Sequence, residues 1–350
     1  MLKRLYRLIV PEPLRARVTY AREWTLVFLN YALMRRKAAG AWPHALYIEA
    51  TNICNAACVF CAYPQMERPK VTMPLELFKK AVTQYLELGP GEIDLTPIVG
   101  DPFVDKLLFD RLDWLAANPK VRKFHFYTNA ILMKPELVER LVRYDGRLRV
   151  FCSFGGFDPE TYHKVMGVPQ FGAAVAHIKA LIEAKRRTGS AIGVCVNLRI
   201  PKGSAHGEFW DYLRAARDER LITFDEIDDF DNWGGKVKEE DLRGAGLVPK
   251  PDPVHRGPCR RLLTGPMVLA DGRVNACACR DVEATLIVGD VNETPIGEIL
   301  RGDALRTLLE RHEREDFPEI CKRCTRYESV YPTWTHGRLW RAARKLVGKV

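Results

Sequence analysis

Short apolar runs alternate with longer amphipathic segments through residues 44–228. Runs rich in β-branched and aromatic residues, bounded by Gly, Asp or Asn, are typical of buried strands. They predict strands at 44–50, 92–98, 122–127, 147–153, 192–199 and 223–228. Apolar residues at helical spacing predict helices at about 74–88, 103–117, 134–143, 158–166, 173–188 and 207–219.

Six strands that alternate with helices predict a parallel sheet with right-handed connections, curved into an open or closed barrel. In such barrels the functional residues lie at the carboxyl ends of the strands. Polar and glycine-rich positions follow four of the predicted strands, at 54–61, 100–101, 128–129 and 153–156. The sequence therefore predicts a functional site at one rim of the barrel.

A different pattern follows the last of these helices and strands. Apolar residues alternate around Asp271-Gly272, which predicts a hairpin within 267–278, and a helix is expected at about 296–312. We therefore expect four parts in the chain. They are a basic helical N-terminal extension (1–43), a barrel (44–245), a small second domain (246–332) and a basic amphipathic C-terminal tail (333–350).

The charge of the chain is concentrated at its two ends. The 350 residues include 54 Lys and Arg against 44 Asp and Glu, a net charge of +10. Residues 1–40 carry +7 and residues 335–350 carry +5, so the central body is close to neutral. A nucleic-acid enzyme would show its basic surface within the folded body, so we expect no nucleic-acid partner.

Basic ends with interleaved Leu, Trp and Tyr are typical of helices that cap a fold or of segments that lie on a membrane surface. The apolar stretch 24–34 is well short of the roughly 20 residues that cross a bilayer. No signal peptide is expected, because Pro11 and Pro13 interrupt the first apolar stretch. We expect a cytoplasmic protein, with peripheral contact at the inner face of the membrane as the alternative to capping helices.

The ten cysteines form two groups and two singles. In a reducing cytosol such clustering indicates metal or catalytic chemistry rather than disulfides. Cys54, Cys58 and Cys61 provide three thiolates within eight residues and no fourth ligand nearby. Structural zinc takes four ligands, whereas a [4Fe–4S] cluster held by three cysteines leaves one iron open to a substrate or cofactor.

The second group could enclose either a cluster or a zinc ion, and its spacing does not choose between them. Its members are Cys259, Cys277, Cys279, Cys321 and Cys324. The single residues Cys152 and Cys195 lie in apolar strands, where cysteine is usually a small buried hydrophobe.

The order of these motifs is specific. Cys54-x3-Cys58-x2-Cys61, with Phe60 before the last cysteine, follows the first strand of a six-unit β/α chain and resembles the radical S-adenosylmethionine (SAM) superfamily. The resemblance implies a partial (β/α)6 TIM-like barrel with SAM bound to the open iron of a [4Fe–4S] cluster. It also implies reductive cleavage of SAM to methionine and a 5′-deoxyadenosyl radical, which abstracts a hydrogen atom from the substrate.

The second cysteine group, with Gly272 between Cys259 and Cys277, resembles the SPASM/Twitch subgroup of that superfamily. The resemblance implies a small Twitch/SPASM-type domain with an auxiliary [4Fe–4S] cluster. The ligands implied by the shorter Twitch arrangement are Cys259, Cys277, Cys321 and Cys324. Cys279 is then left beside the cluster, where it could replace Cys277 or be a free thiol that donates a hydrogen atom.

The resemblance also implies residues that bind the cofactor. Cys54, Cys58 and Cys61 match the cluster ligands. Gly100-Asp101-Pro102 stands where the family usually has Gly-Gly-Glu-Pro, with Val99 in place of the first glycine and a side chain one methylene shorter at Asp101. The implied SAM contacts are Gly100, Asp101, Pro102, Asn129 and Ser153. For Ser153, a satisfied hydroxyl at the end of a strand is the alternative.

An auxiliary cluster near the barrel mouth favours either oxidation or epimerisation of the substrate. Peptide-modifying members often carry an N-terminal leader-binding domain, and residues 1–43 are too short for one. We therefore expect a small polar substrate, such as a sugar, an aminocyclitol or a lipid-linked glycan, and a flavodoxin- or ferredoxin-type electron donor. The alternatives are a maturase of a ribosomally made peptide or a protein side chain and, more distantly, a non-catalytic zinc or iron–sulfur protein.

Overall fold

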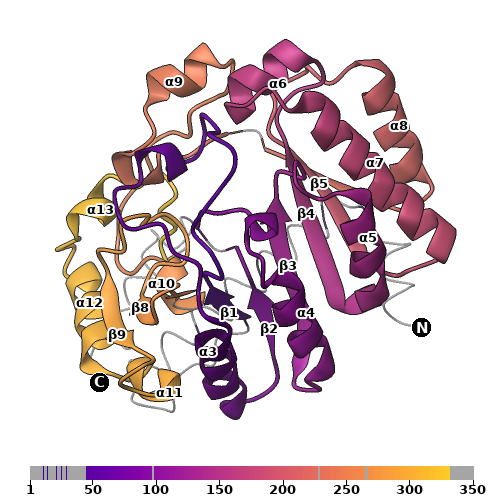
Figure 1. The fold of residues 1–350 in the computed structure, drawn as a ribbon. Coiled ribbons are helices and arrows are strands. Elements are labelled where there is room, and N and C mark those ends of the chain that lie inside the picture. Colours follow the sequence, from indigo (N-terminus) through magenta and orange to yellow (C-terminus); the bar gives the residue numbers. More distant parts are fainter. Residues whose placement is uncertain are drawn as a thin grey trace.

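The computed structural model describes residues 45–331, except 97, 228 and 265–266, together with positions 11, 14, 21, 25 and 29. Apart from those five positions, the predicted N-terminal extension and C-terminal tail lie outside the described residues. Helices α3 to α8 are ranged along the sheet, and the segment that follows residue 260 lies beside strand β1 (Figure 1).

Within the described residues, the barrel part consists of six parallel strands. They are β1 (Ala45–Ile48), β2 (Gly91–Asp94), β3 (Val121–Thr128), β4 (Leu148–Phe154), β5 (Gly193–Leu198) and β6 (Thr223–Glu226). Their order in the sheet is their order in the chain, and each strand pairs in parallel with the next. The predicted α/β class with a partial parallel barrel is confirmed.

Every crossover between these strands contains helix. The main helices are α3 (Leu75–Glu87), α4 (Leu108–Ala117), α5 (Pro135–Leu141), α6 (Pro159–Met166), α7 (Phe171–Thr188) and α8 (Gly207–Asp218). Short 3-10 turns are η1 (Tyr63–Gln65), η2 (Pro102–Val104), η3 (Val142–Arg147) and η4 (Trp233–Gly235). The crossovers match the predicted helices closely, with two local differences.

The second strand is shorter than expected, and the helix after it begins later. Strand β2 ends at Asp94, because the Asp94 carboxylate accepts a hydrogen bond from the Thr96 N–H (2.9 Å) and closes a turn. The helix predicted from residue 103 begins at Leu108. Asp105 separates it from η2, with extended backbone and a side chain that accepts from the Leu107 N–H (2.8 Å).

The second domain extends the same sheet. The predicted hairpin is present as β7 (Met267–Val268) and β8 (Arg273–Asn275), and β9 (Ile287–Asp290) pairs antiparallel with β8. Strand β7 also pairs in parallel with β1, which gives a nine-stranded sheet in the order β6-β5-β4-β3-β2-β1-β7-β8-β9. The barrel and the hairpin therefore share one hydrogen-bonded sheet.

The helices of this domain are short. They are α10 (Arg261–Thr264), α11 (Ile296–Ile299), α12 (Asp303–Glu313) and α13 (Glu319–Lys322), and α9 (Glu239–Gly244) precedes them at the end of the barrel part. The single helix expected at 296–312 is two helices, because the backbone of Gly302 is extended (φ −70°, ψ 163°) between α11 and α12.

Strand alternation positions the site. In β4 the side chains of Val150, Cys152 and Phe154 are fully buried, and Phe154 packs against Tyr162 and Phe209 from the covering helices. The intervening Ser153 faces the barrel cavity, because successive side chains of a strand point to opposite faces. A second apolar cluster lies in the auxiliary domain and is separate from the barrel core.

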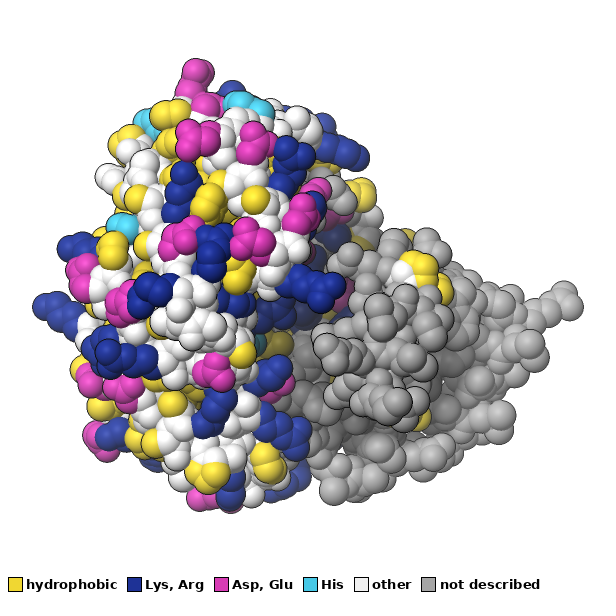
Figure 2. All heavy atoms as spheres, turned by 90° about the vertical axis from the view of Figure 1, so that its right-hand side faces the viewer, with side chains coloured by type: hydrophobic (Ala, Val, Ile, Leu, Met, Phe, Trp, Pro, Cys, Tyr) yellow, Lys and Arg dark blue, Asp and Glu magenta, His cyan; other side chains and the backbone are white. Residues whose placement is uncertain are grey.

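Charges of both signs are intermixed on the face formed by α5, α7 and α8 (Figure 2). Arg186 pairs with Glu183 and Glu219, and Arg187 pairs with Glu139. Among the described helices, no single one is both long and apolar enough to cross a membrane. Helices α6 and α7 pass that test only when they are taken together, and they meet at 94°.

Candidate functional site

The loop after β1 carries Cys54, Cys58 and Cys61, and backbone contacts with the end of α6 hold it in place. The Ala57 N–H donates to Met166 O (3.2 Å), and the Val59 N–H donates to Val165 O (3.0 Å). The next residue, Gly167, has a φ of 70°, and a Cβ there would overlap the carbonyl of Ala57. Glycine is required at this position both by its left-handed backbone and by the close approach of the loop.

The three thiols line one cavity of about 420 Å³ at the carboxyl ends of the barrel strands. Burial raises the pKa of Cys54 to about 12, and the nearby charge of Asp101 acts in the same direction. Burial also raises the pKa of Cys58 and of Cys61, and for Cys58 the neighbouring Cys61 and Cys54 raise it further. Thiols in such surroundings become thiolates only when a cationic group binds them.

The loop after β2 brings Gly100 and Asp101 to the same cavity. Gly100 has a φ of 108°, and a Cβ there would overlap the carbonyl oxygen of Thr51 beside the cysteine loop. The fully buried Asp101 carboxylate accepts from Phe103 N (3.0 Å), Thr128 Oγ1 (2.9 Å) and Asn129 N (2.8 Å). Asp101 therefore ties the end of β2 to the end of β3, a role that the sequence did not predict.

The remaining predicted SAM contacts separate into two groups. Asn129 and Ser153 line the cavity, and Asn129 donates to Asn55 Oδ1 (2.9 Å) beside the first cysteine. Ser153 Oγ accepts from Arg199 Nε at 3.3 Å. Pro102 is buried in the first turn of η2 and is not among the residues that line the cavity.

Several charged residues of the cavity were not predicted. Arg199 follows β5, and its guanidinium lies 4.9 Å from the centre of the Phe60 ring. His125 Nε2 lies 3.2 Å from Asp94 Oδ2. Burial lowers the pKa of His125, but Asp94 more than offsets this and raises it above its ordinary value. The available signal was their position at or near the ends of predicted strands.

The acidic segment that follows β6 contributes Asp229, Asp231 and Trp233 to the wall of the cavity. Asp231 forms a two-pronged ion pair with Arg280, with Nε–Oδ1 at 2.5 Å and Nη2–Oδ2 at 2.8 Å. The Arg280 guanidinium lies 4.3 Å from the Trp233 ring centre, and Trp233 Nε1 donates to Phe60 O (2.7 Å). These contacts join the cysteine loop, the segment after β6 and the auxiliary domain.

The five auxiliary cysteines line one small cavity, which shares part of its lining with the barrel cavity. Burial raises the pKa of Cys259 to about 11 and that of Cys277 to about 12, and for Cys277 the neighbouring Cys279 acts in the same direction. Of the five cysteines only Cys279 also lines the barrel cavity. Cys152 and Cys195 are buried in their strands, as the sequence predicts.

Two family models match this chain. The model described as the radical SAM superfamily matches residues 48–216, and the model described as an iron–sulfur cluster-binding domain (SPASM) matches residues 259–325. The chain belongs to the radical SAM superfamily. The first matched segment contains the cysteine loop after β1, and the second contains all five cysteines of the auxiliary group.

The curated relatives share a partial match with this radical SAM protein. The GTP 3′,8-cyclase of Petrotoga mobilis is 26% identical over 179 residues, which cover 50% of this chain and 53% of that protein. The GTP 3′,8-cyclase of Desulforamulus reducens is 24% identical over 206 residues, or 56% of this chain and 61% of that protein. The chain thus spans little more than half the length of these relatives.

Solved structures show the same fold at low identity. SuiB of Streptococcus suis, solved with its precursor peptide SuiA, has a TM-score of 0.57 and 17% identity, covering 79% of this chain and 68% of SuiB. The structure of anSMEcpe with AdoMet and a peptide has a TM-score of 0.52 and 15% identity, covering 87% of this chain and 96% of that chain.

The donor sets of the radical SAM protein fit the cofactors of its family, namely SAM, a [4Fe–4S] cluster and auxiliary iron–sulfur chemistry. Three thiols line the cavity at the strand ends and five line the small cavity of the second domain, but among the described residues no three such side chains are drawn together in the arrangement of a bound metal ion. Thiolate sulfur is the ligand that iron–sulfur clusters take in proteins. Which thiol binds which iron stays a prediction.

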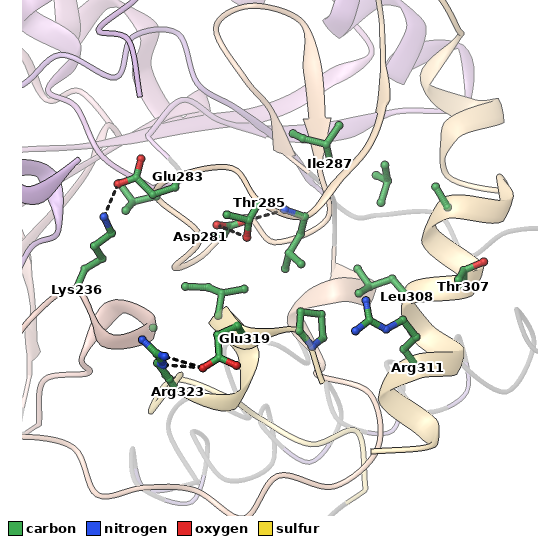
Figure 3. A pocket seen from close by; sticks show the side chains of 17 residues that line it. Lys236, Asp281, Glu283, Thr285, Ile287, Thr307, Leu308, Arg311, Glu319 and Arg323 are labelled. Atoms are coloured by element: carbon green, nitrogen blue, oxygen red, sulfur yellow. Dashed lines mark hydrogen bonds and ion pairs between the residues drawn. The ribbon is translucent and has the colours of Figure 1, made fainter. Parts of the chain in front are cut away.

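A further cavity of about 650 Å³ lies between β9, α12 and α13 (Figure 3). Its charged side chains are paired, including Lys236 with Glu283 (2.8 Å) and Arg323 with Glu319 (2.7 Å). It shares Asp281, Leu286 and Ile320 with the auxiliary cysteine cavity. Changes in this groove can therefore reach the auxiliary cysteines through shared walls.

Proposed function

We propose that this radical SAM enzyme abstracts a hydrogen atom from a small polar substrate held between the barrel strand ends and the auxiliary domain. The observation that carries the proposal is the shared cavity of about 420 Å³, lined by the three cysteines of the first loop and by Cys279 and Arg280 of the second domain. Pockets for one drug-sized ligand occupy roughly 300–1,000 Å³, and SAM itself is of that size. We propose a sugar, an aminocyclitol or the end of a lipid-linked glycan as the substrate.

The protein's part in this chemistry is to bind, orient and shield. When bound, the cluster and SAM supply a 5′-deoxyadenosyl radical. We propose that Cys54, Cys58 and Cys61 hold the first cluster, while Gly100, Asn129 and Ser153 line the SAM site. Asp101 already accepts three hydrogen bonds, so its role is to fix the two loops that contact SAM. Arg199, which donates to Ser153, is a further cation available to a carboxylate.

Two outcomes for the substrate radical are consistent with the cavity. In the first, a net two-electron oxidation, the auxiliary cluster would accept one electron, and the His125–Asp94 pair, which lines the same cavity, would take one proton. Alternatively, hydrogen-atom transfer from the Cys279 thiol to the opposite face gives an epimer. An electron from the reductant and a proton then restore the thiol.

The first test is metal content and SAM cleavage after anaerobic reconstitution. We expect about eight irons with matching sulfide per chain, and release of 5′-deoxyadenosine with dithionite. Replacing Cys54, Cys58 and Cys61 together by alanine removes about half of the iron and abolishes that release. Zinc without sulfide would overturn the proposal.

Cys279→Ala separates the two outcomes. An epimerase loses the inverted product but still releases 5′-deoxyadenosine, whereas an oxidase keeps its product. A variant that retains full turnover with inverted product refutes the hydrogen-donor role. Solvent deuterium appears at the inverted carbon only in the epimerisation case, because a thiol hydrogen exchanges with water.

The alternative substrate is a ribosomally made peptide or a protein side chain. Its support is the groove of about 650 Å³ beside the edge strand β9, which is large enough for part of a peptide. A panel of sugar phosphates, nucleotides and peptides, scored by substrate-dependent 5′-deoxyadenosine release, distinguishes the candidates. Stimulation by peptides alone contradicts the small-substrate proposal.

We further propose a cytoplasmic enzyme reduced by a flavodoxin- or ferredoxin-type protein, with peripheral contact to the inner face of the membrane through the basic ends. Flotation with anionic liposomes, with and without residues 1–40 and 335–350, tests the membrane contact. Equal flotation of both forms removes it.

A further inference from the structure

The auxiliary domain presents arginine side chains to the barrel cavity. Arg261, Arg280 and Arg326 line this cavity and also the cavity of the auxiliary cysteines. They therefore lie between the two cysteine groups, where a substrate would be placed by the proposed function. None of the three directly follows a barrel strand. The expectation that functional residues lie at the carboxyl ends of the strands therefore does not predict them.

The three arginines differ in how their charge is compensated. Arg280 is neutralised by Asp231 through two hydrogen bonds. Arg261 reaches Glu328 only at 3.5 Å, and its Nε is buried without a hydrogen-bond partner. The guanidinium of Arg326 has no hydrogen bond with any other described residue and interacts with Asp231 only through its charge, and its Nε is also buried without a partner.

Buried donors without acceptors are costly. An unsatisfied buried polar group costs about 1–3 kcal/mol, and more if it is charged. Two guanidinium Nε atoms in this condition beside one cavity indicate that an acceptor is supplied from outside the protein. Guanidinium groups match carboxylate and phosphate oxygens in a two-pronged geometry.

Carboxylates from the barrel strands also line the cavity. Asp94 and Asp225 line it from β2 and β6, and Asp94 faces His125. A ligand that bridges these walls needs an anionic end toward the arginines. Its other end needs hydroxyl or amine donors toward the carboxylates.

We propose that the substrate carries an anionic group, phosphate or carboxylate, which is held by Arg261 and Arg326 of the auxiliary domain. This rests on the proposed function, because it assigns one end of the substrate of the same cavity. The anionic group is anchored beside the auxiliary cysteines, and the rest of the molecule extends toward the barrel interior. Arg280, already paired with Asp231, positions this wall rather than adding charge.

Binding of simple anions tests the assignment without knowledge of the substrate. Inorganic pyrophosphate and malonate represent the two anion classes, and each is titrated calorimetrically into the reconstituted, SAM-saturated protein at constant ionic strength. We expect one of them to bind the wild-type protein. We expect R326Q and R261Q each to raise the Kd of that anion by on the order of tenfold or more, which is the effect of losing a charge-assisted hydrogen bond.

Two further variants guard against trivial effects. R326K keeps the positive charge but loses the two-pronged geometry of the guanidinium group. We expect its affinity for the anion to lie between that of R326Q and that of the wild type. R243Q removes an exposed arginine whose partner is Glu239 on the same helix, and we expect it to bind like the wild type. Unchanged iron content and far-UV circular dichroism establish that each variant is folded.

The outcomes separate this assignment from the proposed function. Preference for pyrophosphate indicates a phosphorylated substrate, and preference for malonate indicates a carboxylate. Failure of both anions to bind the wild type, or equal binding by R326Q and R261Q, overturns the anion site even if SAM is cleaved. If the wild-type protein binds the anion but does not cleave SAM, that result contradicts the proposed function instead.

Discussion

Arg68 joins the segment after the cysteine loop to both halves of the structure, and its removal gives a sharp prediction. Its guanidinium donates to both carboxylate oxygens of Glu49, with Nη1–Oε1 at 2.8 Å, and its Nε donates to Val282 O at 2.5 Å. The side chain of Glu49 is 0% exposed and that of Arg68 is 9% exposed. The Glu49 carboxylate also accepts from Ala270 N at 3.3 Å.

Arg68→Met leaves the Glu49 carboxylate buried without its cation. Removing one partner of a buried pair costs about 3–5 kcal/mol, because the remaining charge is neither hydrated nor paired. Replacing both Arg68 and Glu49 by Met removes that charge, so the double variant should lose much less than the sum of the single losses. The matched control is Arg187→Met at an exposed pair (62% and 49% exposed), which should cost less than about 1 kcal/mol.

Urea unfolding of the reconstituted protein, followed anaerobically by far-UV circular dichroism, measures these differences. A change in midpoint at unchanged slope reports stability alone. The reasoning is refuted if Arg68→Met costs no more than Arg187→Met. It is also refuted if the double variant loses the full sum, since the single losses would then not come from an uncompensated charge.

Three further changes test the described contacts. Gly100→Ala should cost more unfolding free energy than Gly189→Ala, which shares a positive φ but has open space around it, and equal urea midpoints would contradict the close approach. Burial lowers the pKa of His312 to about 4, so stability should fall as pH drops from 6.5 toward 4, by about 2 kcal/mol at pH 5. His312→Phe should flatten that pH dependence of the urea midpoint, and an unchanged slope would refute it. Trp233→Phe loses the hydrogen bond to Phe60 O and should cost about 1–3 kcal/mol in the same assay, with no change as the refuting result.

The parts of the fold that depend on local periodicity could be predicted from the sequence. The six barrel strands, their helices and the Asp271-Gly272 hairpin lie where apolar spacing and turn residues place them. The two cysteine groups could also be recognised, because their spacing is itself local. The early end of strand β2 at Asp94 could not be predicted, because it depends on the hydrogen bond that the Asp94 carboxylate accepts from the Thr96 N–H.

The parts of the site that depend on distant pairs could not be predicted. Arg280 and Asp231 are 49 positions apart, and nothing in the neighbourhood of either residue identifies the other. The motif implies that Asp101 contacts SAM, and the structure shows that its carboxylate also accepts three hydrogen bonds from the ends of two loops. A motif marks where a residue stands, but its hydrogen-bond partners decide how much of it is left for a ligand.

The position of Cys279 illustrates how a non-local pairing decides what chemistry is available. Tyr47 of β1 lies in register with Met267 of β7, so the hairpin is fixed to the first barrel strand. The chain that leaves the hairpin then places Cys279 on the barrel cavity, while Cys277, two residues earlier, lines only the auxiliary cavity. A thiol that reaches both cavities can act as a ligand or as a hydrogen donor, whereas one confined to the auxiliary cavity can act only as a ligand. The β1–β7 pairing, rather than the cysteine spacing, thus places Cys279 on the barrel cavity.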